Sequence, residues 1–271
     1  MADRGDCRDF KVAICAVFKD ENRYVREWLE YHASIGIDYF LMYDNMSAVP
    51  LAETISDYID AGVATVIDLP GTHKGRQTEA YAQAIERLGD FEWAAFIDID
   101  EFVVLLEEAT DIKAYLKRYD DDVSSVGLHW LVFGANGHLK TQDSVLESYT
   151  QSCPNSYRCR HIKTILRVSR FERSGSPHYF FVSSGRIADV RGNVIKKQKG
   201  GWGQRPPILN EVMRVNHYAT RSRECFELKK QRGGGNSPAR RKDDDYFDSI
   251  QTEDVQNHDI LQLVKRIKSA G

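Results

Sequence analysis

The side chains best suited to chemistry form an acidic segment after a strand-like run. Asp98 and Asp100 follow the apolar residues 93–97, and Glu101 comes directly after them. In extended backbone, carboxylates two residues apart point the same way, and their repulsion favours a divalent cation between them. Oxygen ligands suit Mg²⁺ and Mn²⁺, which leave coordination positions for phosphate oxygens. The segment therefore predicts a metal that neutralises a departing diphosphate, with Glu101 orienting a ligand.

This segment has two other interpretations. An acidic turn after a strand is common without a metal, and an Asp-x-Asp pattern alone predicts one only weakly. The preceding strand and the following Glu101-Phe102 strengthen the metal interpretation. An aspartyl phosphatase motif also follows a strand, but it has Thr or Val where this chain has Glu101. That motif also usually lies on the first strand, whereas this segment follows the fourth.

The elements that must position the segment alternate between strand and helix. Strands are expected at 11–18, 39–43, 63–68 and 93–97, and helices at 22–36, about 50–61 and 75–89. Such alternation predicts a parallel sheet with helices on both faces, which binds ligands at the C-terminal ends of its strands. The polar clusters at 19–22, 44–47 and 98–101 all fall at such ends.

The pattern changes after residue 105. Strands are expected at 124–133, 162–169, 178–182 and 213–218, and loops at 185–209 and 233–245. A helix is expected at about 110–119, and a second one, capped by Ser222, extends to about 231. A C-terminal amphipathic helix is marked by Ile260, Leu261, Val264 and Ile267. This predicts a nucleotide-binding half, residues 10–105, and a substrate-shaping half, residues 106–271, fused around one core.

Bulk composition excludes several classes of protein. The chain has 271 residues, 42% apolar and 28% charged, with a formal net charge of -3, so nothing drives it toward nucleic acid. No stretch approaches the roughly 20 apolar residues of a transmembrane segment, and the N-terminus lacks an apolar signal core, so a cytoplasmic protein is expected. The five cysteines include Cys153 and Cys159, which could pair, but free thiols are the favoured interpretation.

Four groups of motifs, in order, resemble family-2-like and family-92 glycosyltransferases. The matching residues are 18–22 with 28–32, 35–37 and 43–47, then 93–102, then 130–138, and last Asn216, His217, Tyr218, Ser222, Phe226, Lys229, Arg232 and Gly233. The likeness covers about residues 10–235. Each motif alone is weak, and their common order gives the resemblance its specificity. Asp20 departs from it, because the family commonly has Asn there.

The resemblance implies a GT-A-type fold, a Rossmann-like, mostly parallel sheet flanked by helices with a fused acceptor-side α+β half. It implies a metal-dependent, inverting transfer of a sugar from a nucleotide-diphosphate donor, UDP-sugar favoured, to a glycan hydroxyl. Residues 10–105 would then bind the nucleotide sugar, and residues 106–271 would bind the acceptor and complete the metal site. The cofactor would be Mn²⁺ or Mg²⁺. A binding module that holds a nucleotide sugar or glycan without turnover remains the alternative.

Site residues follow from the same resemblance. The implied metal ligands are Asp98, Asp100 and His217. The implied donor contacts are Lys19, Glu21, Asp44, Arg76, Gln77, Asp98 and Ile99. The implied acceptor contacts are Trp130, Phe133, Gly134, Asn136 and His138. The catalytic group comprises Asp98, Asp100 and Glu101, and the base that deprotonates the acceptor stays open among Glu101, His129, Asp189 and Glu211.

Several of these residues also have structural interpretations. Asp44 could close an Asx turn, Glu21 could favour a helix N-terminus, and His217 could be a structural strand residue. Lys163, Arg167 and Lys229 are expected in solvent more than on phosphates. Residues 200–203 could form a lid over the donor.

Overall fold

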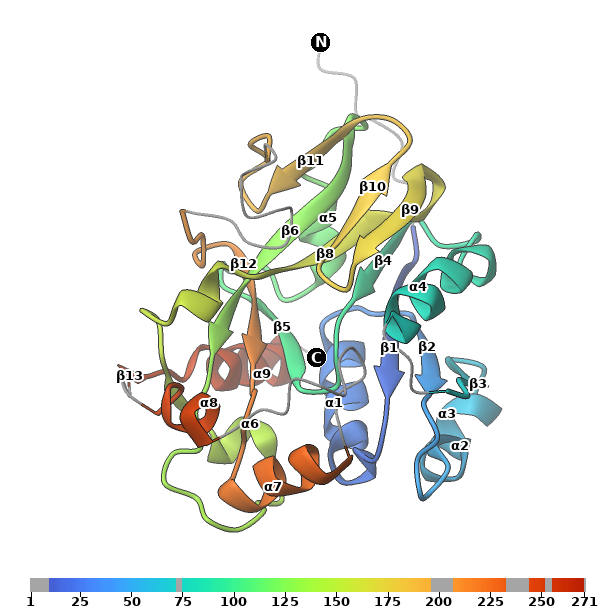
Figure 1. Ribbon diagram of the computed structural model, residues 1–271. Helices are drawn as coiled ribbons and strands as arrows, with labels where there is room; N and C mark the ends of the chain where they lie inside the picture. Colours follow the sequence, from blue (N-terminus) through green and yellow to red (C-terminus); the bar gives the residue numbers. More distant parts are fainter. Residues whose placement is uncertain (1–9, 72–74, 196–206, 233–243, 252–254, 271) are drawn as a thin grey trace.

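A computed structural model describes residues 10–71, 75–195, 207–232, 244–251 and 255–270, and Figure 1 shows its α/β arrangement. The elements up to residue 105 are β1 (Val12–Phe18), α1 (Asn22–Ser34), β2 (Tyr39–Asp44), α2 (Leu51–Thr54), α3 (Ser56–Asp60), β3 (Ala64–Asp68), α4 (Arg76–Arg87), β4 (Trp93–Phe96) and β5 (Glu101–Leu105). The predicted lid at residues 200–203 lies outside the described residues.

The second half of the chain is richer in strands. Its elements are α5 (Ile112–Leu116), β6 (Val123–Val132), α6 (Val145–Ser148), β7 (Gln151–Ser152), η1 (Tyr157–Arg160), β8 (Ile162–Arg167), η2 (Val168–Arg170), β9 (Phe171–Ser176), β10 (Tyr179–Val182), β11 (Arg186–Asp189), β12 (Met213–His217), α7 (Arg223–Arg232), α8 (Asp244–Asp248), β13 (Val255–Gln256) and α9 (Asp259–Ala270). None of the described helices is both long and apolar enough to cross a membrane.

One sheet joins both halves of the chain. Within the described residues it has nine strands, in the order β3-β2-β1-β4-β8-β6-β12-β5, with β11 beside the first half of β6. The strands β3, β2, β1 and β4 are parallel, and β8 runs antiparallel between β4 and β6. The expected α/β class with a mostly parallel sheet is confirmed.

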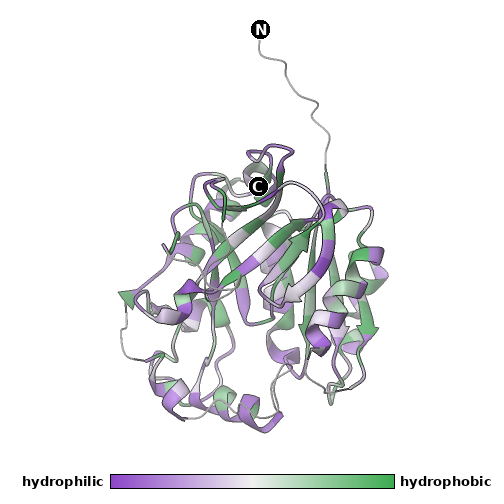
Figure 2. Cartoon of the chain, turned by 45° about the horizontal axis from the view of Figure 1, so that its top comes forward, coloured by the Kyte–Doolittle hydropathy of each residue, from purple (hydrophilic) through white to green (hydrophobic). Residues whose placement is uncertain are grey.

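Alternating side chains of the strands build a core on each face of the sheet. In β1, Ile14 packs with α1 residues such as Trp28, whereas Cys15 packs on the other face with α4 residues such as Tyr81. This is the period-two pattern expected of a strand buried on both faces. Figure 2 shows the central strands largely apolar, with polar residues concentrated in the surrounding helices and loops.

Helix α1 fixes the strand that follows the acidic segment. Trp28 Nε1 donates to the Glu101 carbonyl at 2.7 Å, and Tyr31 Oη donates to the Val103 carbonyl at 2.6 Å. The Val103 N–H donates to His32 Nε2 at 3.2 Å. Because these three side chains lie at helical spacing on one face, they hold the backbone of β5 in register with the helix.

The sequence-based element predictions differ from the structure in several places. The helix expected at 50–61 is two short helices, α2 and α3, because the buried Ile55 interrupts it with non-helical backbone. Strand β5 was not predicted, and β11 lies where only irregular loop was expected. Residues 244 and 245, expected at the end of a loop, are the first residues of α8.

The cysteines in the described part of the chain form no disulfide. Cys15, Cys153, Cys159 and Cys225 are all buried thiols. Cys7 lies outside the described residues.

Candidate active site

The acidic segment is a turn between β4 and β5. The Glu101 N–H donates to the Asp98 carbonyl at 3.0 Å, and residues 99 and 100 are in turn conformation. The expectation of extended backbone was wrong, because this turn carries the chain from β4 to β5. As a result, Asp98 and Asp100 have different partners.

Asp98 lies between α4 and β8. Gln77, in the first turn of α4, donates from Nε2 to Asp98 Oδ1 at 2.6 Å. Lys163 of β8 donates from Nζ to Asp98 Oδ2 at 3.0 Å. The Asp98 side chain is still 34% exposed, so it is open to a ligand.

Glu101 lies beneath Asp98 and is fully buried. Its Oε2 accepts the Asp98 N–H at 2.9 Å and lies 3.2 Å from Lys163 Nζ. Burial raises the pKa of Glu101 to about 8, against the opposing effect of Lys163. Glu101 therefore holds the turn and Lys163 in place from below the site.

Asp100 faces α7 and the end of β12, both in the second half of the chain. Its Oδ2 accepts a hydrogen bond from Lys229 Nζ of α7 at 2.6 Å and lies 3.7 Å from His217 Nε2 at the end of β12. Although burial opposes ionisation, Lys229 and His217 hold the pKa of Asp100 well below its usual range. The Tyr218 N–H also donates to the Asp100 carbonyl at 2.8 Å, which fixes the end of β12 against the turn.

Glu21 organises two arginines beside Asp100. Each of its carboxylate oxygens forms an ion pair with one guanidinium, Oε2 with Arg221 and Oε1 with Arg232. Against the effect of burial, these cations and Lys229 lower the pKa of Glu21 to about 2. Arg232 also donates to the carbonyls of Lys19 and Asp20 at 2.6 and 2.9 Å, so it ties α7 to the loop after β1.

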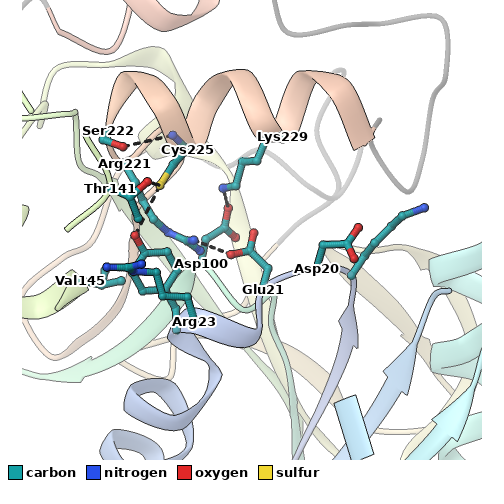
Figure 3. A network of polar contacts seen from close by, with 12 residues as sticks. Asp20, Glu21, Arg23, Asp100, Thr141, Val145, Arg221, Ser222, Cys225 and Lys229 are labelled. Carbon is teal, nitrogen blue, oxygen red and sulfur yellow. Dashed lines mark hydrogen bonds and ion pairs between the residues drawn. The ribbon is translucent and has the colours of Figure 1, made fainter. Parts of the chain in front are cut away.

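Arg221 is strained and buried. Its φ is 51°, and its guanidinium lies over the Tyr24 ring at 4.3 Å. Its Nε and Nη2 atoms have no hydrogen-bond partner within the described ranges. Figure 3 shows Arg221 and Lys229 directed from α7 and the preceding turn toward Glu21 and Asp100, while the Cys225 sulfur lies beside Thr141.

The donor atoms of Asp100 and His217 fit a metal of the predicted kind. A carboxylate oxygen and an imidazole nitrogen are ligands that manganese accepts, and Asp100 Oδ2 and His217 Nε2 lie 3.7 Å apart. In the described ranges no group of three or more His, Cys, Asp and Glu side chains is arranged around a metal. Asp98 is directed to Lys163 instead, so the fit is a two-residue one that phosphate oxygens would complete.

Trp130 packs against three histidine rings, one of which is that of His217 beside Asp100. Its ring centroid lies 4.2 Å from that of His217, 4.9 Å from that of His161 and 5.3 Å from that of His178. Its buried Nε1 has no partner in the described part of the chain. Burial lowers the pKa of both His161 and His178, the latter to about 3, so these rings are neutral near pH 7.

The remaining predicted donor residues are mostly engaged within the chain. Asp44 closes its turn through Ser47 and also accepts the Leu51 N–H at 2.8 Å. Arg76 pairs with Glu79 at 2.9 Å. Lys19 is half-buried in the loop after β1, and Ile99 is buried in the acidic turn.

Of the predicted acceptor residues, Trp130 packs against His217, which lies 3.7 Å from Asp100. Phe133 is fully buried and packs on Tyr218. A Cβ at Gly134 would lie 2.8 Å from a Gln251 side-chain oxygen, so close packing explains this glycine. Asn136 and His138 contact the Ser148 carbonyl at 3.2 and 3.0 Å and hold the loop before α6.

The candidates for the acceptor base lie in different places. His129 is buried on β6, where the Leu209 N–H approaches its Nδ1 at 3.4 Å. Asp189 accepts the N–H groups of Arg191 and Asn193 in the turn after β11. Glu211 pairs with the Arg191 side chain at 2.8 Å. Glu101 is at the acidic turn but fully buried.

Comparison with known proteins gives the family. The family model "Glycosyltransferase family 92" matches residues 8–231, and the chain belongs to this family. A glycosyltransferase family 92 protein of Oryza sativa is 26% identical over 224 residues, covering 80% of this chain and 35% of the relative. A family 92 protein of Ricinus communis is 30% identical over 99 residues, covering 36% of this chain and 18% of the relative. The chain thus spans about a third or less of the length of these two relatives.

Among solved structures, the chain is similar to S. aureus TarS (residues 1–349) in complex with UDP-GlcNAc. The identity is 13%, the TM-score is 0.48, and the match covers 96% of this chain and 73% of TarS. The family membership and the strand order agree with the GT-A-type fold expected from the sequence.

Sequence reasoning did not identify most of the basic and imidazole side chains around the acidic turn. Lys163 and Lys229 were expected in solvent, and Arg221, His161 and His178 were not assigned a role. A lysine on a strand is a weak signal, because the sequence does not tell which strand lies beside the acidic segment. Only the strand order shows that β8, which carries Lys163, lies beside β4.

Proposed function

We propose that this chain transfers a sugar from a nucleotide-diphosphate donor, with UDP-sugars favoured, to a hydroxyl of a glycan or glycoconjugate. The transfer depends on Mn²⁺ or Mg²⁺ and inverts the anomeric carbon. Residues 10–105 bind the nucleotide sugar, and residues 106–271 supply the acceptor wall and complete the metal site. The observation that carries the proposal is the convergence of Asp100 and His217 with three cations, Lys229, Arg221 and Arg232, at the C-terminal edge of the sheet.

The proposed roles follow from the positions of the side chains. Asp100 and His217 would hold the metal, which when bound supplies positive charge to the diphosphate leaving group. Asp98, open to solvent and fixed by Gln77 and Lys163, would orient the donor. Lys19, Glu21, Asp44, Arg76 and Ile99 would shape the donor side of the site, several of them through backbone contacts.

The acceptor side is built on Trp130. Aromatic rings pack well on sugar faces, and the neutral rings of His161 and His178 extend the same wall. Phe133, Gly134, Asn136 and His138 support the adjoining loop. Of the base candidates from the sequence, Glu101 lies nearest the reaction, but its burial favours a role in holding Asp98 and Lys163.

A thermal-shift panel of nucleotide sugars, with and without Mn²⁺, tests the proposal. Metal-dependent stabilisation by one group of donors, lost in Asp98→Ala and Asp100→Ala and retained in the exposed control Asp121→Asn, is expected. The same variants should lose product formation with a glycan acceptor. Full turnover in Asp100→Ala would refute its role, and donor binding without any product would favour the non-catalytic binding module.

A further inference from the structure

Lys229 occupies the side of Asp100 that a metal would take. Its ammonium lies 2.6 Å from Asp100 Oδ2, and the same oxygen lies 3.7 Å from His217 Nε2. An ammonium and a divalent cation repel each other, and both are attracted to one carboxylate oxygen. A metal bound by Asp100 and His217 must therefore displace the Lys229 ammonium from Oδ2.

The neighbouring cations are anchored elsewhere. Arg221 and Arg232 are each paired with Glu21, which is separate from the proposed metal pair. Lys229 is instead paired with the metal ligand itself. Its four-carbon stem can redirect the ammonium by changing rotamers, while α7 stays fixed by Ser222 Oγ, which accepts the Cys225 N–H at 3.1 Å.

Charge balance indicates where the displaced ammonium goes. Arg221, Lys229 and Arg232 face two carboxylates, Glu21 and Asp100, so the cluster has an excess of one positive charge. Addition of a divalent cation raises this excess to three. A diphosphate is the anion that balances it, and a released ammonium is a strong phosphate partner.

We propose that Lys229 is the resident counter-cation of Asp100, exchanges with the divalent metal, and then binds a phosphate of the donor. This inference rests on the proposed function, because it takes Asp100 and His217 as the metal pair. It follows that the metal alone binds weakly and that metal and nucleotide bind cooperatively, since the diphosphate gives the displaced ammonium a new partner.

Binding of Mn²⁺ and UDP, measured by calorimetry, tests the exchange. Lys229→Met should bind Mn²⁺ alone about tenfold more tightly than the unmodified protein, a change of about 1.4 kcal/mol, because the ammonium no longer competes for Asp100. With saturating Mn²⁺, the same variant should bind UDP about tenfold more weakly. Lys229→Gln should behave likewise, and Lys229→Arg should keep the low metal affinity because it retains the cation.

Lys230→Met is the matched control. Lys230 is the next residue of α7 and pairs with Glu227 at 3.2 Å and Asp244 at 3.4 Å, so its loss should change neither affinity. Unchanged or weaker Mn²⁺ binding in both neutral Lys229 variants would overturn the exchange. UDP binding that needs Lys229 but no metal would also overturn it, since Lys229 would then replace the metal permanently. If neither UDP nor any donor of the nucleotide-sugar panel binds the unmodified protein, the proposed function itself fails.

Discussion

His32 should make the fold sensitive to mild acid. The ring is fully buried, its Nδ1 lies 2.8 Å from the Trp28 carbonyl, and its Nε2 accepts the Val103 N–H. A carbonyl needs a donor and an N–H needs an acceptor, so both ring nitrogens are committed to the neutral tautomer. Burial accordingly lowers the pKa of His32 from 6.5 to about 3.

The magnitude follows from proton linkage. A lowered pKa means that the unfolded chain binds the proton first, so stability is lost as pH falls below 6.5 and until about 3. At 1.36 kcal/mol per pH unit, the loss is about 2 kcal/mol by pH 5 and about 5 kcal/mol in full. The first figure corresponds to a fall in Tm of roughly 4 to 8 °C.

Urea denaturation at pH 7, 6 and 5 checks this value in the wild type and in His32→Gln. Glutamine offers one donor and one acceptor but does not titrate. Between pH 7 and pH 5 the free energy of unfolding of His32→Gln should therefore fall by about 2 kcal/mol less than that of the wild type. The exposed His258→Gln serves as the control and should show the wild-type loss. Parallel pH curves for the wild type and His32→Gln would refute the reasoning.

Three further predictions concern the site and its supports. Burial raises the pKa of Glu101 to about 8, so the wild type should lose stability as the pH rises from 4.5 to 8. Over that range the stability of Glu101→Gln should increase by up to about 5 kcal/mol relative to the wild type. Urea denaturation of the metal-free proteins checks this, and the same difference between variant and wild type at pH 5 and pH 8 would contradict it. Trp130→Ala should raise the acceptor KM about tenfold while the Kd for UDP stays within about twofold, and an unchanged KM would remove Trp130 from the acceptor wall. Ser222→Ala should lower the free energy of unfolding by about 1 kcal/mol and Ser222→Asp should restore it, whereas no loss in the alanine variant would argue against the cap.

Local sequence signals were enough for the parallel half of the sheet. The strands β1 to β4 and the helices α1 and α4 have apolar periodicity and turn residues of their own, and each prediction lay close to the observed bounds. The strand β5 was missed because its first residue, Glu101, belongs to the acidic motif and looked like part of a polar turn. Its backbone is held by pairing with β12 and by Trp28, Tyr31 and His32, all of which are distant in sequence.

The same limit explains what was missed in the site. The carboxylates of Asp98 and Asp100 were read as needing a metal to offset their repulsion. In the structure Lys163 and Lys229 already supply positive charge, one to each. No pattern in a single sequence pairs Lys229 with a residue 129 positions earlier, because that contact depends on the packing of α7 against the turn after β4.

The charge network also dictates an order of assembly during synthesis. The contacts of Glu21 with Arg221 and Arg232 span 200 and 211 residues. The ribosome therefore releases the whole parallel half of the sheet long before its counter-charges exist, and closing such long loops is slow. Until residue 232 emerges, the nascent chain carries Glu21 and Asp100 without these partners. The donor end of the site should accordingly become rigid only after α7 has been made, and a chain stalled before α7 should present an acidic, unfinished edge.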